Sequence, residues 1–198
     1  MGKTFNPTLT GIILAGGKSS RMGTPKGLLK WNGKTLIEHS VGKLKPWCDE
    51  LLLSANTNDY DNQNITIVND EIKKIGPIAG ILACLKKSSN SLNFVLSCDI
   101  PMVSEHLIRY LLSNVNPSRI VVPRFNGKIE PLCGIYLKEL VPLLEDAIST
   151  KSYGIQSFIL QNKPIILDVD LHFPFYHPNL FLNINSPSDF GLLDSLSL

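Results

Sequence analysis

The chain has 198 residues, of which 43% are hydrophobic and 18% are charged, and its formal net charge is +2. This length can bury the core of one domain, and the balanced charge excludes a basic nucleic-acid-binding face or an acidic tail. Four cysteines without a C-x-x-C pair argue against a zinc site or a disulfide framework, and no apolar run could span a bilayer. We therefore expect a single cytoplasmic domain over residues 1–198, with neither nucleic acid nor a membrane as partner.

Short apolar segments alternate with helical patterns along the chain. Strands are predicted at 9–14, 50–54, 65–68, 94–97, 120–123 and 130–137, with a hairpin over 28–36, and helices at about 35–45, 77–87, 104–114 and 138–148. Thr35 and Glu38 have the spacing of a capping box. The alternation implies βαβ units, and so an α/β fold with a doubly wound, mostly parallel, Rossmann-like sheet in one three-layer domain.

The most informative stretch is GIILAGGKSSRMGTPK at 11–26, where a strand pattern passes directly into a loop. Gly16 and Gly17 let bare backbone approach an anion, because no side chain is in the way. The cations that follow within ten residues are Lys18, Arg21 and Lys26. Their charges can spread over the phosphates of a nucleoside triphosphate, so the stretch predicts a nucleotide-binding loop.

Two familiar phosphate loops do not fit this stretch. Gly17-Lys18-Ser19 looks like the end of a Walker A loop, but Ile12 stands where that motif requires a glycine. The glycines of the stretch do not have the spacing of the G-x-G-x-x-G dinucleotide fingerprint either. The remaining pattern, L-A-G-G-x-S-x-R-M-G-x-x-K, resembles the nucleotidyltransferases built on a doubly wound sheet, and among them the molybdenum cofactor guanylyltransferases. That resemblance implies that Arg21 and Lys26 are catalytic. It also implies that the loop residues on the nucleotide are Leu14, Ala15, Gly16, Gly17 and Lys26.

Asp99 follows an apolar strand in the sequence Leu-Ser-Cys-Asp-Ile-Pro-Met. A hard cation such as magnesium takes one or two carboxylates and completes its shell with water and phosphate oxygens, so one aspartate suffices. The alternative from the residues alone is a turn former or helix cap. The resemblance favours the metal, because the family places its magnesium ligand in an Asp-x-Pro segment after this strand. Asp99 is therefore predicted to be catalytic, to contact the nucleotide and to bind Mg²⁺.

Further nucleotide contacts are implied by the resemblance at Asn56, Asp70 and Gly76. Asn56 lies in a Ser-Ala-Asn-Thr-Asn segment, where asparagine also often satisfies local backbone. Asp70 could accept two hydrogen bonds from the ring N–H and amino group of guanine, or it could contact ribose. The turn from Gly76 to Gly80 either packs closely on the base or simply starts a helix with Pro77.

Near the C-terminus, the segment 181–190 predicts a short strand followed by a helix with Ser186 as its N-cap. The pattern N-I-N-[ST]-P resembles the part of the guanylyltransferase family that faces the pterin substrate. Asn183 and Asn185 are therefore predicted to bind the pterin, and their spacing places both on one face of the strand. The alternative for either asparagine is a structural role at the helix cap.

The expected chemistry needs no protein nucleophile. A phosphate monoester has a second pKa of about 6, so at neutral pH it is already an anion that can attack an α-phosphorus in line. The resemblance implies transfer of GMP from GTP to the terminal phosphate of molybdenum-bound molybdopterin, which yields molybdopterin guanine dinucleotide and pyrophosphate. GTP would bind the half at about 9–100 and the acceptor the half at about 101–190. Other molybdenum cofactor biosynthesis proteins or apo-molybdoenzymes are further expected partners.

Two alternatives remain open. Cytidylyltransferases of the same superfamily share the loop, and Pro25 stands where the guanylyltransferases often have an acidic residue. A non-catalytic nucleotide-binding or cofactor-binding accessory protein could also use this fold. Such a binding protein would not need Arg21, Lys26 and Asp99 together, which favours an enzyme.

Overall fold

The computed structural model describes residues 8–16, 25–57, 59–60, 65–115 and 120–196. Its strands are β1 (Leu9–Leu14), β2 (Lys30–Trp31), β3 (Lys34–Thr35), β4 (Glu50–Ser54), β5 (Thr66–Val68), β6 (Leu92–Ser97), β7 (Ile120–Phe125), β8 (Lys128–Ile129), β9 (Cys133–Leu137) and β10 (Ile165–Val169). Its α-helices are α1 (Leu36–Leu44), α2 (Pro77–Lys87), α3 (Glu105–Ser113), α4 (Val141–Ser149), α5 (Ile155–Gln161) and α6 (Pro187–Ser195), and 3-10 turns occupy Lys26–Leu28 and Lys138–Leu140.

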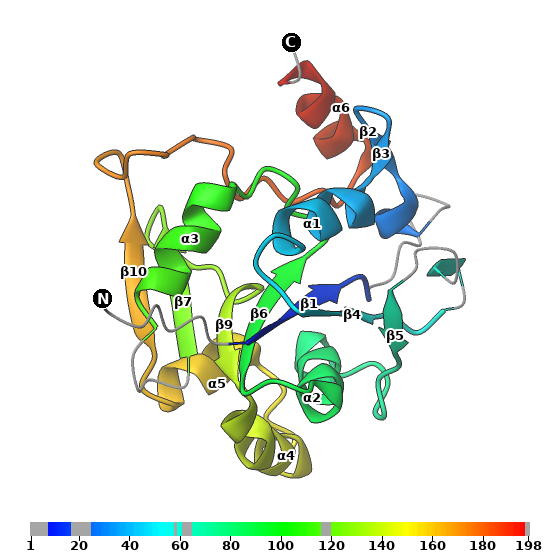
Figure 1. The fold of residues 1–198 in the computed structure, drawn as a ribbon, viewed down its shortest axis with the longest axis vertical. Helices are drawn as coiled ribbons and strands as arrows, with labels where there is room; N and C mark the ends of the chain where they lie inside the picture. The colour runs from blue at the N-terminus through cyan, green and yellow to red at the C-terminus, as the bar shows by residue number, and fades with distance from the viewer. Residues whose placement is uncertain (1–7, 17–24, 58, 61–64, 116–119, 197–198) are drawn as a thin grey trace, which may run out of the picture.

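One central sheet organises the molecule, with strand order β10-β7-β9-β6-β1-β4-β5 and β8 beside β7. The pairs β1 with β4, β1 with β6, β4 with β5 and β7 with β10 are parallel, whereas β9 runs antiparallel to both of its neighbours. Helices cover both faces, with α1 and α3 on one side and α2, α4 and α5 on the other (Figure 1). The expected three-layer, mostly parallel α/β fold is therefore confirmed.

Alternating side chains of β1 supply both layers of the core. Leu9 and Ile13 are buried on the side of α1 and α3, and Ile12 and Leu14 are buried on the side of α2 and α4. A strand that is apolar on both faces is what burial between two helical layers requires. This places β1 at the centre of the domain, and its carboxyl end opens toward the predicted loop.

The local signals that set the helix starts are present as predicted. The Thr35 hydroxyl accepts from the Glu38 N–H at 3.1 Å, and a Glu38 carboxylate oxygen accepts from the Thr35 N–H at 2.6 Å. Asn32 and Gly33 both have positive φ, at 47° and 78°, which closes the β2–β3 hairpin with the twist such turns favour. Ser104 caps α3 by accepting from the Leu107 N–H at 3.2 Å.

Several features differ from the sequence-based expectation. Helix α5 and the strands β8 and β10 were not predicted; β10 adds a parallel edge strand beside β7. The strand predicted at 130–137 is shorter, since pairing with β6 begins at Cys133. The prediction of a short strand just before α6 is wrong, because residues 182–185 have no regular secondary structure. Those residues leave the sheet after β10 and run across to the end of β6, where Ile184 makes one isolated backbone bond, from its N–H to the Asp99 carbonyl at 2.8 Å.

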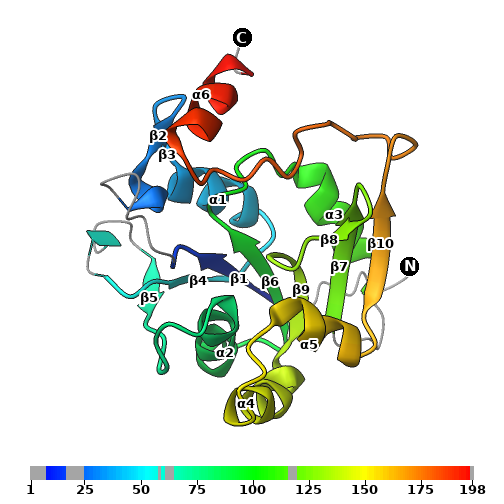
Figure 2. The ribbon, with the colours of Figure 1, turned by 180° about the vertical axis from the view of Figure 1, so that it is seen from behind.

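The C-terminal helix closes over the hairpin rather than the sheet. Viewed from behind, the chain from β10 crosses the carboxyl edge of the sheet before entering α6, which lies beside β2 and β3 (Figure 2). Leu36, Ile184 and Leu193 form a small buried cluster of their own there. None of the helices in the described part of the chain has the length and apolarity needed to cross a bilayer.

Candidate active site

The candidate site lies at the carboxyl ends of β1, β4, β5 and β6. The chain leaves β1 through α1 to β4 on one side, and later returns through α2 to β6 on the other, so the strand order reverses at β1. Open α/β sheets bind ligands in the crevice outside such a reversal. The Leu14 carbonyl accepts from the Cys98 N–H at 3.0 Å, and the Ala15 N–H donates to the Ser54 carbonyl at 3.0 Å. These bonds fix the start of the predicted nucleotide loop against both neighbouring strands.

Gly16 is exposed at this edge, and a Cβ added to it would meet no atom within 4 Å. The glycine therefore leaves open space in front of the backbone, as a phosphate-binding loop requires. The predicted residues Gly17 and Arg21 lie outside the described residues.

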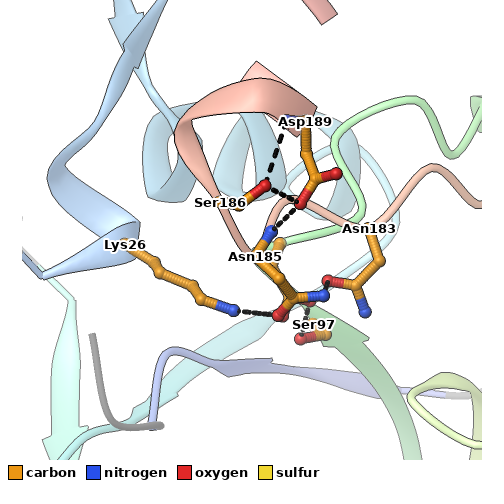
Figure 3. Close-up of polar contacts among 7 residues, drawn as sticks. Lys26, Ser97, Asn183, Asn185, Ser186 and Asp189 are labelled. Carbon is orange, nitrogen blue, oxygen red and sulfur yellow. Dashed lines mark hydrogen bonds and ion pairs between the residues drawn. The ribbon is translucent and has the colours of Figure 1, made fainter. Parts of the chain in front are cut away.

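Lys26, Asp99 and Asn185 come together from three distant parts of the chain. The Lys26 ammonium donates to the Asn185 side-chain oxygen (Figure 3) and lies 3.4 Å from an Asp99 carboxylate oxygen. Both charged side chains are about four-fifths buried, at 18% relative exposure each. Charges in this setting are weakly screened by solvent, so Lys26 can act strongly on a nearby anion and Asp99 on a nearby cation.

Asp99 is held in position by its backbone and by its neighbour in β6. The Ser97 hydroxyl donates to one Asp99 carboxylate oxygen at 2.6 Å, and the Asp99 carbonyl accepts from Ile184. The partly buried Lys43 ammonium of α1 donates to the carbonyl of Pro101, and burial lowers the pKa of Lys43 to about 8. Ser97 and Lys43 were not predicted. Ser97 ends a buried strand two residues before Asp99, which is the signal that could have found it.

Both predicted pterin-site asparagines lie on the same side of the C-terminal segment. The Asn185 side-chain amide donates to the Asn183 side-chain oxygen at 2.7 Å, although neither residue is in a strand (Figure 3). The cap of α6 is made by Ser186, whose hydroxyl accepts from the Asp189 N–H at 3.3 Å. The Asp189 carboxylate accepts from the Ser186 hydroxyl and the Asn185 N–H, which hold its pKa below the usual range. The two asparagine side chains are therefore not used by the cap.

Asn56 and Asp70 form a second cluster, at the ends of β4 and β5. The Asn56 amide donates to an Asp70 carboxylate oxygen at 2.7 Å, and the Asp70 N–H donates back to the Asn56 side-chain oxygen at 3.0 Å. The buried Ser54 hydroxyl donates to the other Asp70 oxygen at 3.3 Å. This reciprocal arrangement fixes the direction of the carboxylate.

The turn before α2 completes that cluster. Gly76 has φ of 87°, a conformation that favours glycine, and Pro77 is the first helical residue. A Cβ on Gly80 would lie 2.3 Å from the Ser54 hydroxyl oxygen and 3.3 Å from an Asp70 oxygen. Gly80 therefore lets α2 approach the Ser54 and Asp70 side chains.

The comparisons with known proteins place the chain in a family. The family described as "MobA-like NTP transferase domain" matches residues 11–165. The chain belongs to it. A relative named "Probable molybdenum cofactor guanylyltransferase" from Carboxydothermus hydrogenoformans is 38% identical over 93% of this chain and 94% of its own length. Another, named "Molybdenum cofactor guanylyltransferase", from Syntrophotalea carbinolica, is 32% identical over 90% of this chain and 87% of its own.

Solved structures agree with the fold of this MobA-like transferase. Molybdopterin-guanine dinucleotide biosynthesis protein A from Archaeoglobus fulgidus superposes with a TM-score of 0.79 at 23% identity, covering 95% of this chain and 98% of its own. A 4-diphosphocytidyl-2C-methyl-D-erythritol synthase from Anaerococcus prevotii gives a TM-score of 0.76 at 14% identity, with 97% of this chain and 96% of its own covered. Both of these proteins thus share the fold of this chain.

Proposed function

We propose that this MobA-like transferase moves GMP from GTP to the terminal phosphate of molybdenum-bound molybdopterin, with release of pyrophosphate. The observation that carries the proposal is the convergence of Lys26, Asp99 and Asn185 at the reversal of strand order. The names of the relatives support guanylyl transfer to the molybdenum cofactor, because several at 30% identity or more are called molybdenum cofactor guanylyltransferases. We expect the enzyme to work in the cytoplasm and to pass its product to apo-molybdoenzymes or other cofactor biosynthesis proteins.

The binding sites divide along the sheet. GTP would lie over the half at about 9–100, with its phosphates on the backbone of Leu14, Ala15, Gly16 and Gly17. Its guanine would lie near Asn56, Asp70 and Gly76. The paired oxygens of the Asp70 carboxylate suit the ring N–H and amino group of guanine, since each oxygen retains a lone pair after accepting from Ser54 or Asn56. The acceptor would lie over the half at about 101–190, against Asn183 and Asn185.

Asp99 fits a magnesium ion. One Asp99 oxygen accepts a short hydrogen bond from Ser97. The other lies 3.4 Å from the Lys26 ammonium, which is longer than a normal charged hydrogen bond. Among the described residues no group of three or more His, Cys, Asp or Glu side chains could hold a metal, and magnesium needs only one or two carboxylates beside substrate phosphates. Bound there, the ion would neutralise charge on the phosphates of GTP.

The side chains of this site then position the reactants and neutralise their charge. The acceptor phosphate is already an anion at neutral pH, so no general base is required. Lys26, together with Arg21, would stabilise the charge that develops on the α-phosphate and on the leaving pyrophosphate. Asn185 accepts a hydrogen bond from Lys26, so it orients the lysine between the nucleotide half and the acceptor half.

The deciding experiment measures pyrophosphate release from GTP, CTP, ATP and UTP with magnesium, with and without molybdate-loaded molybdopterin. Release with GTP only when the pterin is present is the expected result. Release with CTP in its place would move the enzyme to the cytidylyl branch, and no release with any nucleotide would favour an accessory binding protein. Chelation of magnesium by EDTA should stop the reaction, and added Mg²⁺ should restore it.

A further inference from the structure

Glu130 is a partly buried carboxylate at the carboxyl edge of the sheet for which the proposed function leaves no role. Among the described residues its side chain makes no hydrogen bond and no ion pair, whereas its backbone is fully used. The Glu130 N–H donates to the Pro123 carbonyl at 3.0 Å, and its carbonyl accepts from the Cys133 N–H at 3.3 Å. A carboxylate partly withdrawn from water without a partner is costly, so the fold holds this group in place for another reason.

The position of Glu130 follows from a second hairpin. Strand β7 turns back at Asn126 and Gly127, which have φ of 47° and 77°, and β8 then runs antiparallel beside it. The next residues reach the end of β6, where the Leu132 carbonyl accepts from the Ser97 N–H at 2.8 Å. Ser97 in turn donates to Asp99. Glu130 therefore lies on the same edge of the sheet as Asp99, bridging the ends of β7 and β6.

The Glu130 carboxylate influences a core residue on the side of the sheet that carries α1 and α3. Burial is the main cause of the raised pKa of the Cys133 thiol, and the negative charge of Glu130 raises it further, whereas the positive charge of Lys43 lowers it. Cys133 belongs to the core on the side of α1 and α3, and Lys43 donates to the Pro101 carbonyl just beyond Asp99. Burial also raises the pKa of Glu130 itself to about 6, against the opposing charge of Lys128. Glu130 is thus an ionised, poorly solvated acceptor near the Asp99 segment at neutral pH.

The order of the strands places Glu130 on the acceptor side. Strand β6, with Asp99 at its end, divides β1, β4 and β5, which carry the proposed nucleotide contacts, from β9 and β7. The C-terminal segment reaches this second side as well, because Tyr176 and Phe181 pack on Phe125 at the end of β7, with ring centroids 5.5 Å and 5.2 Å from it. Two residues beyond Phe181 is Asn183. Glu130 and Asn183 therefore flank the acceptor half from two directions.

We propose that the Glu130 carboxylate recognises the pyrimidinone edge of the acceptor's pterin ring and so sets the choice of acceptor; this inference rests on the proposed function. That edge presents a ring N–H beside an exocyclic amine, and a carboxylate offers two adjacent oxygens that accept from both. The phosphate of the acceptor then lies toward Lys26 and Asp99, and the ring lies toward β7 and β9. The site selects a planar ring with two neighbouring donors on one edge.

The test compares two fluorescent probes that differ in one group. Pterin hydroxymethyl phosphate carries the exocyclic amine, and the matching lumazine phosphate carries a carbonyl oxygen there. In equilibrium titrations without nucleotide, the wild-type protein should bind the pterin more tightly than the lumazine. Glu130→Gln should lose about 10-fold to 100-fold in pterin affinity and should now favour the lumazine, because a glutamine side chain offers one acceptor and one donor. A structural role for Glu130 would weaken both probes alike.

Glu139→Gln is the matched control. Glu139 is an exposed carboxylate in the 3-10 turn after β9, where the adjacent Lys138 N–H donates to the Ser91 carbonyl at the opposite edge of the sheet. This variant should bind both probes as the wild type does. Unchanged pterin affinity in Glu130→Gln, or a wild type that does not distinguish the probes or binds neither, would overturn the inference. Loss of GMP transfer by the wild type, with probe discrimination intact, would instead overturn the proposed function alone.

Discussion

Gly80 offers a sharp test of how α2 shapes the candidate nucleotide site. In Gly80→Ala the new methyl group would lie 2.3 Å from the Ser54 hydroxyl oxygen and 3.2 Å from the Ser54 Cβ. Ser54 is buried, with 3% of its surface exposed, so it has little room to move away. Its rotation would break the bond to Asp70. Overpacking of this kind costs about 1–3 kcal/mol, and the helix propensity gained from alanine offsets about 1 kcal/mol.

Gly42→Ala is the control for the helix propensity. Gly42 is an exposed glycine in α1, and an added Cβ would meet nothing within 4 Å. This variant should gain about 0.5–1 kcal/mol in unfolding free energy. Gly80→Ala should therefore be less stable than Gly42→Ala by about 1–3 kcal/mol. Urea unfolding, followed by tryptophan fluorescence, measures both values on the same scale.

A double variant separates the clash from any other effect at this position. Ser54→Ala removes the oxygen that the new methyl group meets first, so Ser54→Ala/Gly80→Ala should recover much of the stability lost in Gly80→Ala. The two changes should show a coupling energy of about 1 kcal/mol or more in a double-mutant cycle. Equal stabilities of Gly80→Ala and Gly42→Ala, or strictly additive effects in the cycle, would refute the packing argument. Weaker GTP binding by Gly80→Ala would connect the same contact to Asp70.

Four further outcomes are expected. Asp99→Asn should lower GMP transfer about 100-fold or more; retained activity at saturating magnesium would exclude Asp99 as the metal ligand. Lys26→Met should lower kcat by about 100-fold, and a change in KM alone would refute its role in the reaction step. Asn185→Ala should raise the KM for the pterin acceptor; a raised KM for GTP instead would place Asn185 on the nucleotide side. Burial lowers the pKa of Lys43 from 10.5 to about 8, so between these pH values the Lys43 side chain is protonated in the unfolded chain and neutral in the folded protein. The unfolding free energy of the wild type, relative to Lys43→Met, should therefore rise by at most about 3 kcal/mol between those pH values, and a flat difference in urea midpoints would contradict this.

The sequence by itself determined the features that depend on neighbouring residues. The capping box at Thr35, the turn at Asn32 and the proline start of α2 are set within a few residues, where backbone geometry and side-chain reach leave little choice. The apolar alternation likewise indicated the layered α/β fold, since burial on two faces imposes its own pattern. Asp99 could be singled out because it follows a strand whose end was recognisable, and Lys26 because it completes the loop pattern that resembles the nucleotidyltransferases.

The tertiary structure decided what depends on distant segments meeting. Strand β10 has few fully buried residues, so its pattern was weak, and pairing with β7 supplies the hydrogen bonds that make it a strand. The segment before α6 has strand-like residues, but within the described part of the chain its backbone meets the sheet only through the bond from Ile184 to Asp99, and it therefore does not form a strand. The contact of Lys26 with Asn185 and the placement of Glu130 beside the end of β6 depend on strand order. Strand order is fixed by how the whole chain packs, and local spacing does not contain it.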